Sequence, residues 1–388
     1  MALGEQPNTM CLLQEGQKEH LFDLTLSVCR ECGLVFIAKP GQREDFYDYV
    51  QMPTSKFPAE HIDEEIEEMA RLYLDSSSDL ILEIASNDGY FLNVLKERGF
   101  TNLHGIEPAA EPARQAVESG LTIRNVYFSR EEAESFVEEY GRPKLIIARH
   151  VLEHIEDLDS FTEGLAVLMD EDSTLFLEVP DFGSVNERGD FSSIWEQHVN
   201  YFDVESLGYL LSRFGIKLDT WRTVPFSGGS LITTSRLDHG VCLDKTSNPQ
   251  RHTARVELAG RMKTRIREVH ALLGGLKAQG KRIAGFGAGA RCSGFLNFAD
   301  VAQYIDYIID EDTRKHGLLM PKSRLGIFSP DQLEKDPVDY CIILPFNSKL
   351  MEAKVMRKYQ AFVDGGGKFI ETWKEEEGGS LTTARVLP

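Results

Sequence analysis

A short apolar strand that runs straight into a turn of small and polar residues is the feature that most constrains this chain. Residues 81–84 read Ile-Leu-Glu-Ile, residues 85–89 read Ala-Ser-Asn-Asp-Gly, and a helical pattern begins at Tyr90. Small side chains let backbone amides approach a ligand, and open α/β sheets bind ligands at the carboxyl ends of their strands. The stretch therefore predicts a Rossmann-like sheet with a ligand site at that edge.

Strands and helices alternate on both sides of this turn, which is typical of a doubly wound α/β domain. The stretch 180–197 shows little periodicity and contains several glycines, so we interpret it as an active-site loop. Predicted strands are 80–84, 103–106, 145–148 and 174–179, and predicted helices are 90–98, 112–119, 158–169 and 204–214.

A second α/β pattern follows a long amphipathic helix. Residues 253–279 repeat apolar side chains at helical spacing, and strand patterns return at 282–286, 305–309 and 340–344. We therefore expect a small domain over 1–45, a Rossmann-like core over 46–245 and a second Rossmann-like domain over 246–388.

Charge and hydropathy narrow the possible partners. The 42 Lys and Arg against 62 Asp and Glu give a formal net charge of −20, which disfavours nucleic acid as a ligand. No segment reaches the roughly 18 to 20 apolar residues of a membrane span, and the N-terminus lacks a secretory pattern. We expect a cytoplasmic protein without a membrane partner, and the sequence does not distinguish a monomer from a homodimer.

The chemistry of the first turn indicates a cationic cofactor. The glycine pattern that cradles a pyrophosphate is absent from residues 85–89, and Asp88 would repel phosphate but suit the cationic amino acid end of S-adenosylmethionine. Glu107, 24 residues beyond Glu83, follows the next strand, where a carboxylate can accept both ribose hydroxyl hydrogens. The alternative is that Asn87 and Asp88 only cap the helix.

Three of the six cysteines lie in the first tenth of the chain, which favours metal binding over disulfides. Cys29 and Cys32 have the spacing of a zinc knuckle, while Cys11 and His20 are the remaining candidate ligands. The alternative is a knuckle that packs its cysteines as small apolar residues without metal.

The second glycine turn, residues 285–290, fits G-x-G-x-x-A after a strand. A nicotinamide or flavin site must be considered, although Asp306 lies near the start of the next strand and not at its carboxyl end. We interpret the turn around Gly287 as gripping a diphosphate with Arg291, assisted by Lys315, Lys322 or Arg324. The alternative is a turn needed only for tight packing.

Several motifs together resemble the C-methyltransferases that act on nucleotide-linked keto-deoxysugars. They are residues 83–89 (E-I-A-S-N-D-G), 105–108 (G-I-E-P), 151–158 (V-L-E-H-I-E-D-L), 228–230 (G-G-S), 285–290, Asn297, 310–317, Pro321 and 344–347 (L-P-F-N). The likeness covers nearly the whole chain. It implies a zinc-binding N-terminal domain, a methyltransferase core and a C-terminal Rossmann-like domain that helps to bind a nucleotide sugar.

The same resemblance assigns the catalytic loop. The family's loop resembles Tyr-His-Glu-His followed by an aromatic pair and supplies a histidine base, and this chain has Trp-Glu-Gln-His at 195–198 followed by Tyr201 and Phe202. His198 is retained, whereas Trp195 and Gln197 replace tyrosine and glutamate. The tyrosine that lines the family's substrate pocket best matches Tyr49.

A methyltransferase that acts on carbon must remove a proton next to a carbonyl, and a histidine with a pKa of about 6.5 suits that task. The rivals to His198 are His150 and His154. The predicted cofactor residues are Glu83, Ala85, Ser86, Asn87, Asp88, Gly89, Glu107, Pro108 and His150. The predicted catalytic residues are His198, Tyr49, Gln197 and Trp195, and the predicted substrate residues are Tyr201, Gly287, Arg291, Asn297, Lys315 and Asn347.

Three other functions stay open. The two loop replacements favour an O- or N-methyltransferase acting on another small molecule. The second glycine turn would suit an NAD(P)-dependent oxidoreductase. The chain could also be a non-catalytic binding protein built on a methyltransferase fold.

Overall fold

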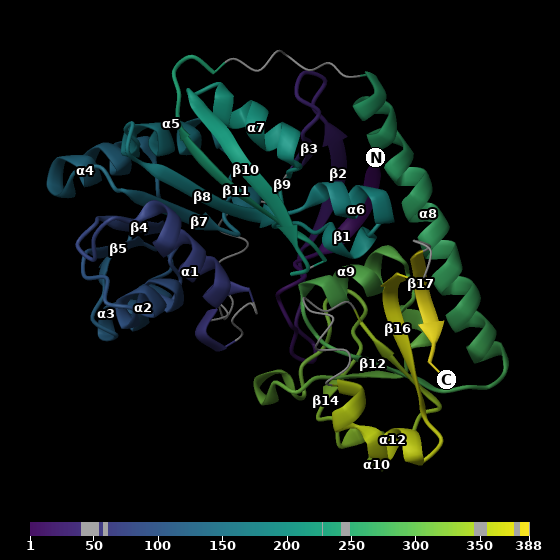
Figure 1. Ribbon diagram of the computed structural model, residues 1–388. Coiled ribbons are helices and arrows are strands. Elements are labelled where there is room, and N and C mark those ends of the chain that lie inside the picture. The colour runs from purple at the N-terminus through teal and green to yellow at the C-terminus, as the bar shows by residue number, and fades with distance from the viewer. Residues whose placement is uncertain are drawn as a thin grey trace.

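A computed structural model describes residues 1–39, 54–56, 61–226, 228–241, 249–344, 355–375 and 381–387. Three sheets organise these residues: one of four strands, one of seven and one of six. In Figure 1 the seven-stranded sheet lies on the left and the six-stranded sheet lies below it. Helix α8 runs down the right-hand side, past both sheets.

The seven-stranded sheet has the order β10-β11-β8-β7-β4-β5-β6. Its strands β4, β5, β6, β7 and β8 are parallel, and the residues of β4 and β5 are buried throughout, as expected for strands covered on both faces. The four predicted strands are confirmed. The bounds are β4 Ile81–Ile84, β5 Leu103–Ile106, β6 Thr122–Arg124, β7 Leu145–Arg149, β8 Thr174–Pro180, β10 Ile216–Val224 and β11 Ser230–Leu237.

An antiparallel hairpin completes this sheet and was not predicted from the sequence. Strand β11 lies between β8 and β10 and is antiparallel to both. The turn between β10 and β11 holds Gly228 and Gly229, which both have positive φ angles. The hairpin distinguishes this sheet from a fully parallel dinucleotide-binding sheet and brings Gly228 to the carboxyl edge of β8.

Helices flank the seven-stranded sheet, and one of them corrects an expectation. The stretch 180–197 was predicted to be a loop, but it contains helix α6 and a 3-10 turn, η4. The side chain of Asp181 caps α6 by accepting the backbone N–H of Gly183, a local signal that apolar periodicity does not report. The bounds are α1 Ile62–Tyr73, α2 Tyr90–Glu97, α3 Ala110–Glu118, α4 Arg130–Tyr140, η3 Leu152–His154, α5 Leu158–Leu168, α6 Phe182–Arg188, η4 Phe191–Ser193 and α7 Val204–Ser212.

The N-terminal strands form a sheet with a strand of the central region. Strand β3 pairs with β9, which directly follows the predicted catalytic loop, and the sheet order is β1-β2-β3-β9. The N-terminal segment is therefore attached to the central region through a shared sheet. The bounds are β1 Ala2–Pro7, β2 Leu21–Val28, β3 Val35–Ile37, β9 Asn200–Tyr201 and the 3-10 turn η2 Thr54–Lys56.

The C-terminal sheet is a second mostly parallel sheet of order β14-β13-β12-β15-β16-β17. One apolar core joins this sheet, the N-terminal strands, α6 and α8. The bounds are β12 Ile283–Phe286, α9 Ala290–Phe298, η5 Ala302–Tyr304, β13 Tyr307–Ile309, η6 Thr313–Lys315, β14 Ile327–Phe328, α10 Gln332–Lys335, β15 Tyr340–Ile343, α12 Gln360–Asp364, β16 Lys368–Glu375 and β17 Leu381–Val386.

Helix α8 (Pro249–Ala278) confirms the predicted long helix and links the two α/β regions. Its predicted apolar face is buried: Leu258, Met262, Val269, Leu273 and Leu276 belong to the shared core. Because this face contacts several parts of the chain at once, the helix holds the regions together as well as connecting them.

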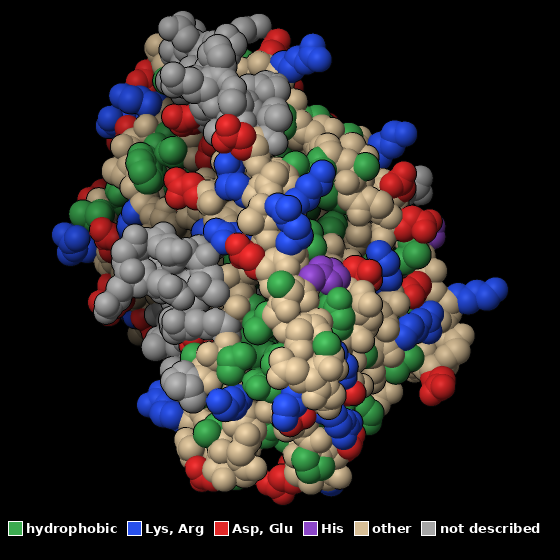
Figure 2. Space-filling view, turned by 90° about the vertical axis from the view of Figure 1, so that its right-hand side faces the viewer, with side chains coloured by type: hydrophobic (Ala, Val, Ile, Leu, Met, Phe, Trp, Pro, Cys, Tyr) green, Lys and Arg blue, Asp and Glu red, His purple; other side chains and the backbone are tan. Residues whose placement is uncertain are grey.

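Two surface properties bear on possible partners. Among the described helices, none is both long enough and apolar enough to cross a membrane. On the face turned toward the viewer in Figure 2, described Lys and Arg side chains are interspersed with Asp and Glu and form no continuous basic surface.

Candidate active site

The turn after β4 has the tight backbone that the sequence predicts. Ala85, Asn87 and Gly89 all have φ between 51° and 72°, in the left-handed region. A non-glycine residue there costs on the order of 1 kcal/mol, and such strain gathers at ligand sites. Gly89 begins α2 with no side-chain cap, so Asn87 and Asp88 do not serve as the helix cap that was the alternative interpretation.

Glu107 ties the turn to the next strand. Its carboxylate accepts the backbone N–H of Asn87 at 2.8 Å and that of Ala109, which follows Pro108, at 2.7 Å. Each carboxylate oxygen has two lone pairs, so one lone pair on each oxygen stays available to hydroxyl hydrogens. Glu107 thus joins the turn after β4 to the end of β5 at one edge of the sheet.

A second segment contacts the turn from outside the sheet. Asp88 Oδ2 accepts the backbone N–H of Ser55 at 3.0 Å and also its hydroxyl, and Asn87 Oδ1 accepts the N–H of Thr54 at 3.2 Å. Ser55 was not predicted to belong to this site, because only its tertiary contact with Asp88, 33 residues away, places it there.

Three buried oxygen atoms around the turn have no hydrogen-bond partner among the described residues. They are Glu83 Oε2, Ser86 Oγ and Asp88 Oδ1. Burial, opposed by Arg149, raises the pKa of Glu83 to about 8, so this carboxyl is largely protonated at neutral pH. Among them, Asp88 offers a carboxylate oxygen without a partner, which suits a cationic ligand, because buried polar atoms are normally paired. These residues therefore fit S-adenosylmethionine.

The carboxyl end of β7 carries a buried ionic network. Glu178 of β8 accepts hydrogen bonds from Arg149 Nε at 2.9 Å and from His61 Nε2 at 2.9 Å, and it lies 3.2 Å from His150 Nε2. Burial alone would lower the pKa of His150, but Glu178 and Glu153 outweigh burial and raise it to about 9. The predicted cofactor residue His150 is thus a cation fixed beside the turn.

The loop that carries His198 is held by three parts of the chain. Glu196 Oε1 accepts the backbone N–H and the hydroxyl of Thr9 at 2.9 and 3.0 Å. The backbone N–H of Val199 donates to the carbonyl of Glu153 at 2.7 Å. Gly294 of α9 packs closely on the backbone of η4, just before the loop. The base candidate is therefore fixed where the N-terminal sheet, the central domain and the C-terminal domain meet.

His198 lies among aromatic rings and cations. Its ring centroid is 4.3 Å from that of Trp195 and 4.9 Å from that of His154. Among the described residues, none hydrogen-bonds a ring nitrogen of His198. Burial, followed by the charges of His154, His150 and Arg291, holds the pKa of His198 well below its usual range. The ring is therefore neutral at neutral pH and carries a free lone pair.

The other predicted loop residues have structural contacts. Gln197 Nε2 lies 3.4 Å from Asn8 Oδ1 and 3.4 Å from Glu196 Oε1. The hydroxyl of Tyr201 is buried and bonds the backbone of Trp195, with distances of 3.2 and 3.3 Å. Tyr201 thus supports the loop from beneath, and its ring lies 6.5 Å from that of His198.

The second glycine turn is closed by a carboxylate from the next strand, as the first turn is. Asp310, at the carboxyl end of β13, accepts the N–H of Ala288 at 2.8 Å and the Lys315 ammonium at 3.0 Å. Gly287 has a φ of 108°, and its N–H donates to the carbonyl of Ile309 at 2.8 Å. The predicted residues Gly287 and Lys315 therefore meet at this turn, through a carboxylate that the sequence analysis did not single out.

The remaining predicted substrate residues are dispersed. Arg291 Nη2 is 2.6 Å from Asp190 Oδ2 in the central domain, and Asn297 donates to Ser293 and to the carbonyl of Pro321. Lys322 and Arg324 contact the N-terminal segment instead of the glycine turn. Tyr49 and Asn347 lie outside the described residues.

The four candidate zinc ligands do not meet in one site. Cys29 and Cys32 interact with each other, whereas the ring of His20 packs on Phe22 at a centroid distance of 4.7 Å. All four are described residues, and within the described chain the only group of three or more metal-capable side chains is Glu153, His154 and His198. Two thiols provide half of a tetrahedral zinc site, so the N-terminal residues do not fit the ion as proposed.

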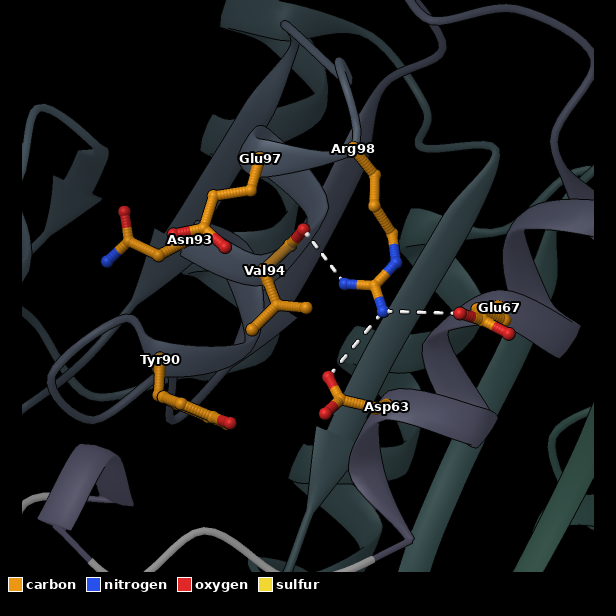
Figure 3. A pocket seen from close by; sticks show the side chains of 7 residues that line it. All are labelled: Asp63, Glu67, Tyr90, Asn93, Val94, Glu97 and Arg98. Atoms are coloured by element: carbon orange, nitrogen blue, oxygen red, sulfur yellow. Dashed lines mark hydrogen bonds and ion pairs between the residues drawn. The ribbon is translucent and has the colours of Figure 1, made fainter.

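A surface pocket of about 490 Å³ lies between α1 and α2 (Figure 3). Arg98 reaches across it to Asp63 and Glu67, at 3.5 and 3.6 Å. Of its lining residues only Tyr90 neighbours the cofactor turn, and none belongs to the predicted cofactor or catalytic set. This pocket is therefore separate from the candidate active site.

Several residues of the site were missed from the sequence, although two left a signal. Glu178 and Arg149 are charges in or at the end of otherwise apolar buried strands, and such charges need partners. Glu153 and Glu196 directly precede His154 and Gln197, two residues that the sequence marked as candidates. His61 left no signal, because its partner Glu178 is 117 residues away.

Comparison with known proteins agrees with this architecture. A family model for the C-methyltransferase C-terminal domain matches residues 244–372, and one for a methyltransferase domain matches residues 56–220. The C-methyltransferase NovU of Streptomyces niveus is 26% identical over 370 residues, which cover 91% of this chain and 86% of NovU.

Solved structures also match in part. The PH0226 protein of Pyrococcus horikoshii is 16% identical, with a TM-score of 0.38, over 51% of this chain and 100% of that chain. The CcbJ methyltransferase of Streptomyces caelestis is 12% identical, with a TM-score of 0.37, over 50% of this chain and 95% of that chain.

The sheet with its antiparallel hairpin, the acidic turn and the family matches define a methyltransferase with a Rossmann-like fold. The chain is an S-adenosylmethionine-dependent methyltransferase.

Proposed function

We propose that this enzyme methylates a carbon next to a carbonyl group, on a nucleotide-linked keto-sugar, and that His198 is the base. The observation that carries this proposal is the state of His198: a neutral ring with no hydrogen bond to either nitrogen among the described residues, fixed beside the carboxyl end of β7. The C-methyltransferase match over 244–372 supports carbon as the methylated atom.

The residues divide the chemical tasks. S-adenosylmethionine supplies an activated methyl group when bound, so the protein must mainly create and orient a nucleophilic carbon. His198 takes the proton from the carbon next to the carbonyl. His150, held as a cation by Glu178 and Glu153, would provide a fixed positive charge near His198 that stabilises the negative charge developing on the acceptor.

The C-terminal domain would hold the nucleotide part of the acceptor. The turn 285–290 and the ammonium group of Lys315 lie at a strand end, where phosphate oxygens are commonly bound. Asp310 Oδ2 already accepts from both Ala288 and Lys315. A carboxylate neutralised in this way is a poor ribose acceptor, which disfavours the oxidoreductase alternative.

The test separates proton removal from methyl transfer. The enzyme is incubated with nucleotide-diphosphate-linked keto-deoxysugars in deuterated water without cofactor, and deuterium at the carbon next to the carbonyl is measured by mass spectrometry. We expect exchange with the native chain and a loss of about 10²- to 10⁴-fold for His198→Asn, with S-adenosylmethionine binding retained.

Labelled cofactor then shows which atom receives the methyl group. A product methylated on oxygen or nitrogen would overturn the C-methylation proposal, and no exchange or transfer across the panel would overturn the sugar acceptor. Calorimetric titration with NADH and NADPH should show no binding. The double variant Trp195→Tyr/Gln197→Glu, which restores the family's tyrosine and glutamate, tests whether the acceptor preference depends on this loop.

A further inference from the structure

Three side chains from two separate segments converge at the candidate active site. Glu153 and His154 belong to η3, His198 belongs to the loop before β9, and one ligand atom from each lies within 4.8 Å of the others. Two hydrogen bonds hold the two segments together. The backbone N–H of Val199 donates to the carbonyl of Glu153, and Asn200 Nδ2 donates to the carbonyl of Ile155 at 2.6 Å. The cluster is therefore built by the fold.

The hydrogen bonds of this cluster leave lone pairs facing one another. His154 Nδ1 is 2.8 Å from the carbonyl oxygen of Gln197, which only accepts, so the network assigns the proton to Nδ1. In the neutral ring the lone pair is then on Nε2, which lies 4.0 Å from Glu153 Oε1. A histidine oriented by a backbone carbonyl in this way is the usual arrangement of a metal ligand.

Glu153 supplies the second, independent observation. Its side chain is 1% exposed, and its Oε2 has no hydrogen-bond partner among the described residues. Neither ring nitrogen of His198 has a hydrogen-bond partner among the described residues. His150 Nδ1 lies 3.3 Å from Oε1 of the same carboxylate, so Oε2 is the Glu153 oxygen that is left without a partner. A bound cation would satisfy Oε2 together with one lone pair from each of the two imidazoles.

The donor set selects the kind of cation. Two imidazoles and one carboxylate suit zinc, cobalt or ferrous iron, whereas magnesium and calcium prefer oxygen ligands. Metal–ligand distances of about 2.0 to 2.2 Å require ligand atoms about 3.3 to 3.5 Å apart, so side-chain torsions must close the cluster by about 1 Å. His154, at 38% exposure, leaves an entry path.

We propose that Glu153, His154 and His198 bind one divalent transition-metal cation of the zinc and cobalt class, and that the bound cation blocks the enzyme. The blocking step rests on the proposed function: the His198 lone pair that would take the acceptor's proton is the one that would bind the ion. Metal and proton transfer would then exclude each other, which makes the site inhibitory.

Binding is tested directly on the full chain in a Cys29→Ser/Cys32→Ser background, which removes the competing thiols. Metal-free protein is titrated with Co²⁺ while the visible d–d absorption is followed, and Zn²⁺ affinity is measured by calorimetric competition. We expect one equivalent per chain. Glu153→Gln and His154→Gln should each weaken binding by about tenfold or more. His270→Gln, which removes a partly buried histidine of α8, should leave it unchanged.

Activity measurements complete the test. Co²⁺ should inhibit the native enzyme, and His154→Gln should shift the inhibition midpoint to higher metal concentration. Circular dichroism checks folding, and the more exposed His154 serves if Glu153→Gln does not fold. The site is overturned by the absence of stoichiometric binding or by unchanged affinity in His154→Gln, and the blocking role by stimulation with Co²⁺.

The two proposals fail separately. Stoichiometric metal binding together with full turnover of metal-free His198→Asn would refute the base and leave the metal site standing. Loss of turnover in that variant without metal binding to the native chain would do the reverse.

Discussion

Asp190 and Arg291 form a buried ion pair, with 2.6 Å between Oδ2 and Nη2, that joins the central domain to helix α9 of the C-terminal domain. The side chains are 1% and 10% exposed. Removing one partner leaves the other charge buried without a counter-charge, so Arg291→Met should lower the free energy of unfolding by about 3 to 5 kcal/mol. Urea denaturation followed by fluorescence and circular dichroism measures this loss.

The matched control is Arg213→Met, whose pair with Asp159 is 43% and 56% exposed. An exposed pair contributes only about 0 to 1 kcal/mol. Equal losses in the two variants would contradict the structural role assigned to the interdomain pair. The double variant Asp190→Asn/Arg291→Met should recover part of the loss, because no uncompensated charge is left.

Glu107 provides the second prediction. It holds the cofactor turn through Asn87 and is expected to accept the ribose hydroxyls, so Glu107→Ala should weaken S-adenosylmethionine binding by about 10- to 100-fold. Isothermal titration calorimetry measures the change. Glu111→Ala, which removes an exposed carboxylate of α3, should bind as the native chain does. Native affinity in the Glu107 variant would exclude it from the cofactor site.

Gly105 in β5 leaves no room for a side chain. A Cβ there would lie 2.5 Å from Ser86 Oγ and 2.6 Å from Ile123 Cδ1. Gly105→Ala should therefore destabilise the protein by about 1 to 3 kcal/mol and disturb the turn at Ser86. Gly260→Ala, in the interior of α8 with open space around it, should instead stabilise by about 0.5 to 1 kcal/mol. Thermal melting that fails to show opposite signs would contradict this packing.

Burial of Glu83 makes stability depend on pH. Its pKa rises from 4.5 to about 8 on folding, so the folded state keeps a proton that the unfolded state has lost between these values. Stability therefore falls as pH rises through this window, by about 1.4 kcal/mol per pH unit. Glu83→Gln keeps the shape but cannot ionise, so its unfolding free energy should fall less steeply between about pH 4.5 and 8. Parallel curves for the two proteins would contradict the assignment.

His150 adds a contribution of the same sign in a higher window. Its pKa rises from 6.5 to about 9, so the stability from its pairs with Glu178 and Glu153 is fully present below pH 6.5 and lost as pH approaches 9. The native chain and Glu83→Gln should therefore both lose stability between about pH 6.5 and 9, and His150→Gln should lose less.

The parts of the candidate site that could be placed from the sequence are local ones. The turn at 85–89 and Glu107 could be assigned because each lies directly after a strand, and parallel strands end at one edge of the sheet. The apolar face of α8 could be assigned for a similar reason, since helical periodicity is a local property.

The rest depended on contacts between distant segments. The bond between Thr9 and Glu196 spans 187 residues, and that between His61 and Glu178 spans 117. The spacing of Cys29 and Cys32 is local and predicted a knuckle, but placing Cys11 and His20 beside them required tertiary information. The hairpin of β10 and β11 was missed because β10 is mostly exposed or half-buried and carries mixed polar residues, while β11 contains several Ser and Thr residues among its buried positions.

The protonation state of His198 yields a prediction about catalysis. Burial and neighbouring cations hold its pKa well below the usual range, so the ring stays neutral as pH falls from about 7.5 to 6. An unperturbed histidine with a pKa of about 6.5 would lose most of its base form over the same interval. With metal-free enzyme and saturating cofactor, we therefore expect kcat/KM for the acceptor to change little across this range. A decline with an apparent pKa near 6.5 would show either that His198 is solvated in the working enzyme or that another group is the base. The same profile recorded for His154→Gln would tell these apart. His154 lowers the pKa of His198 electrostatically, so its removal should move the decline to higher pH only if His198 is the titrating group.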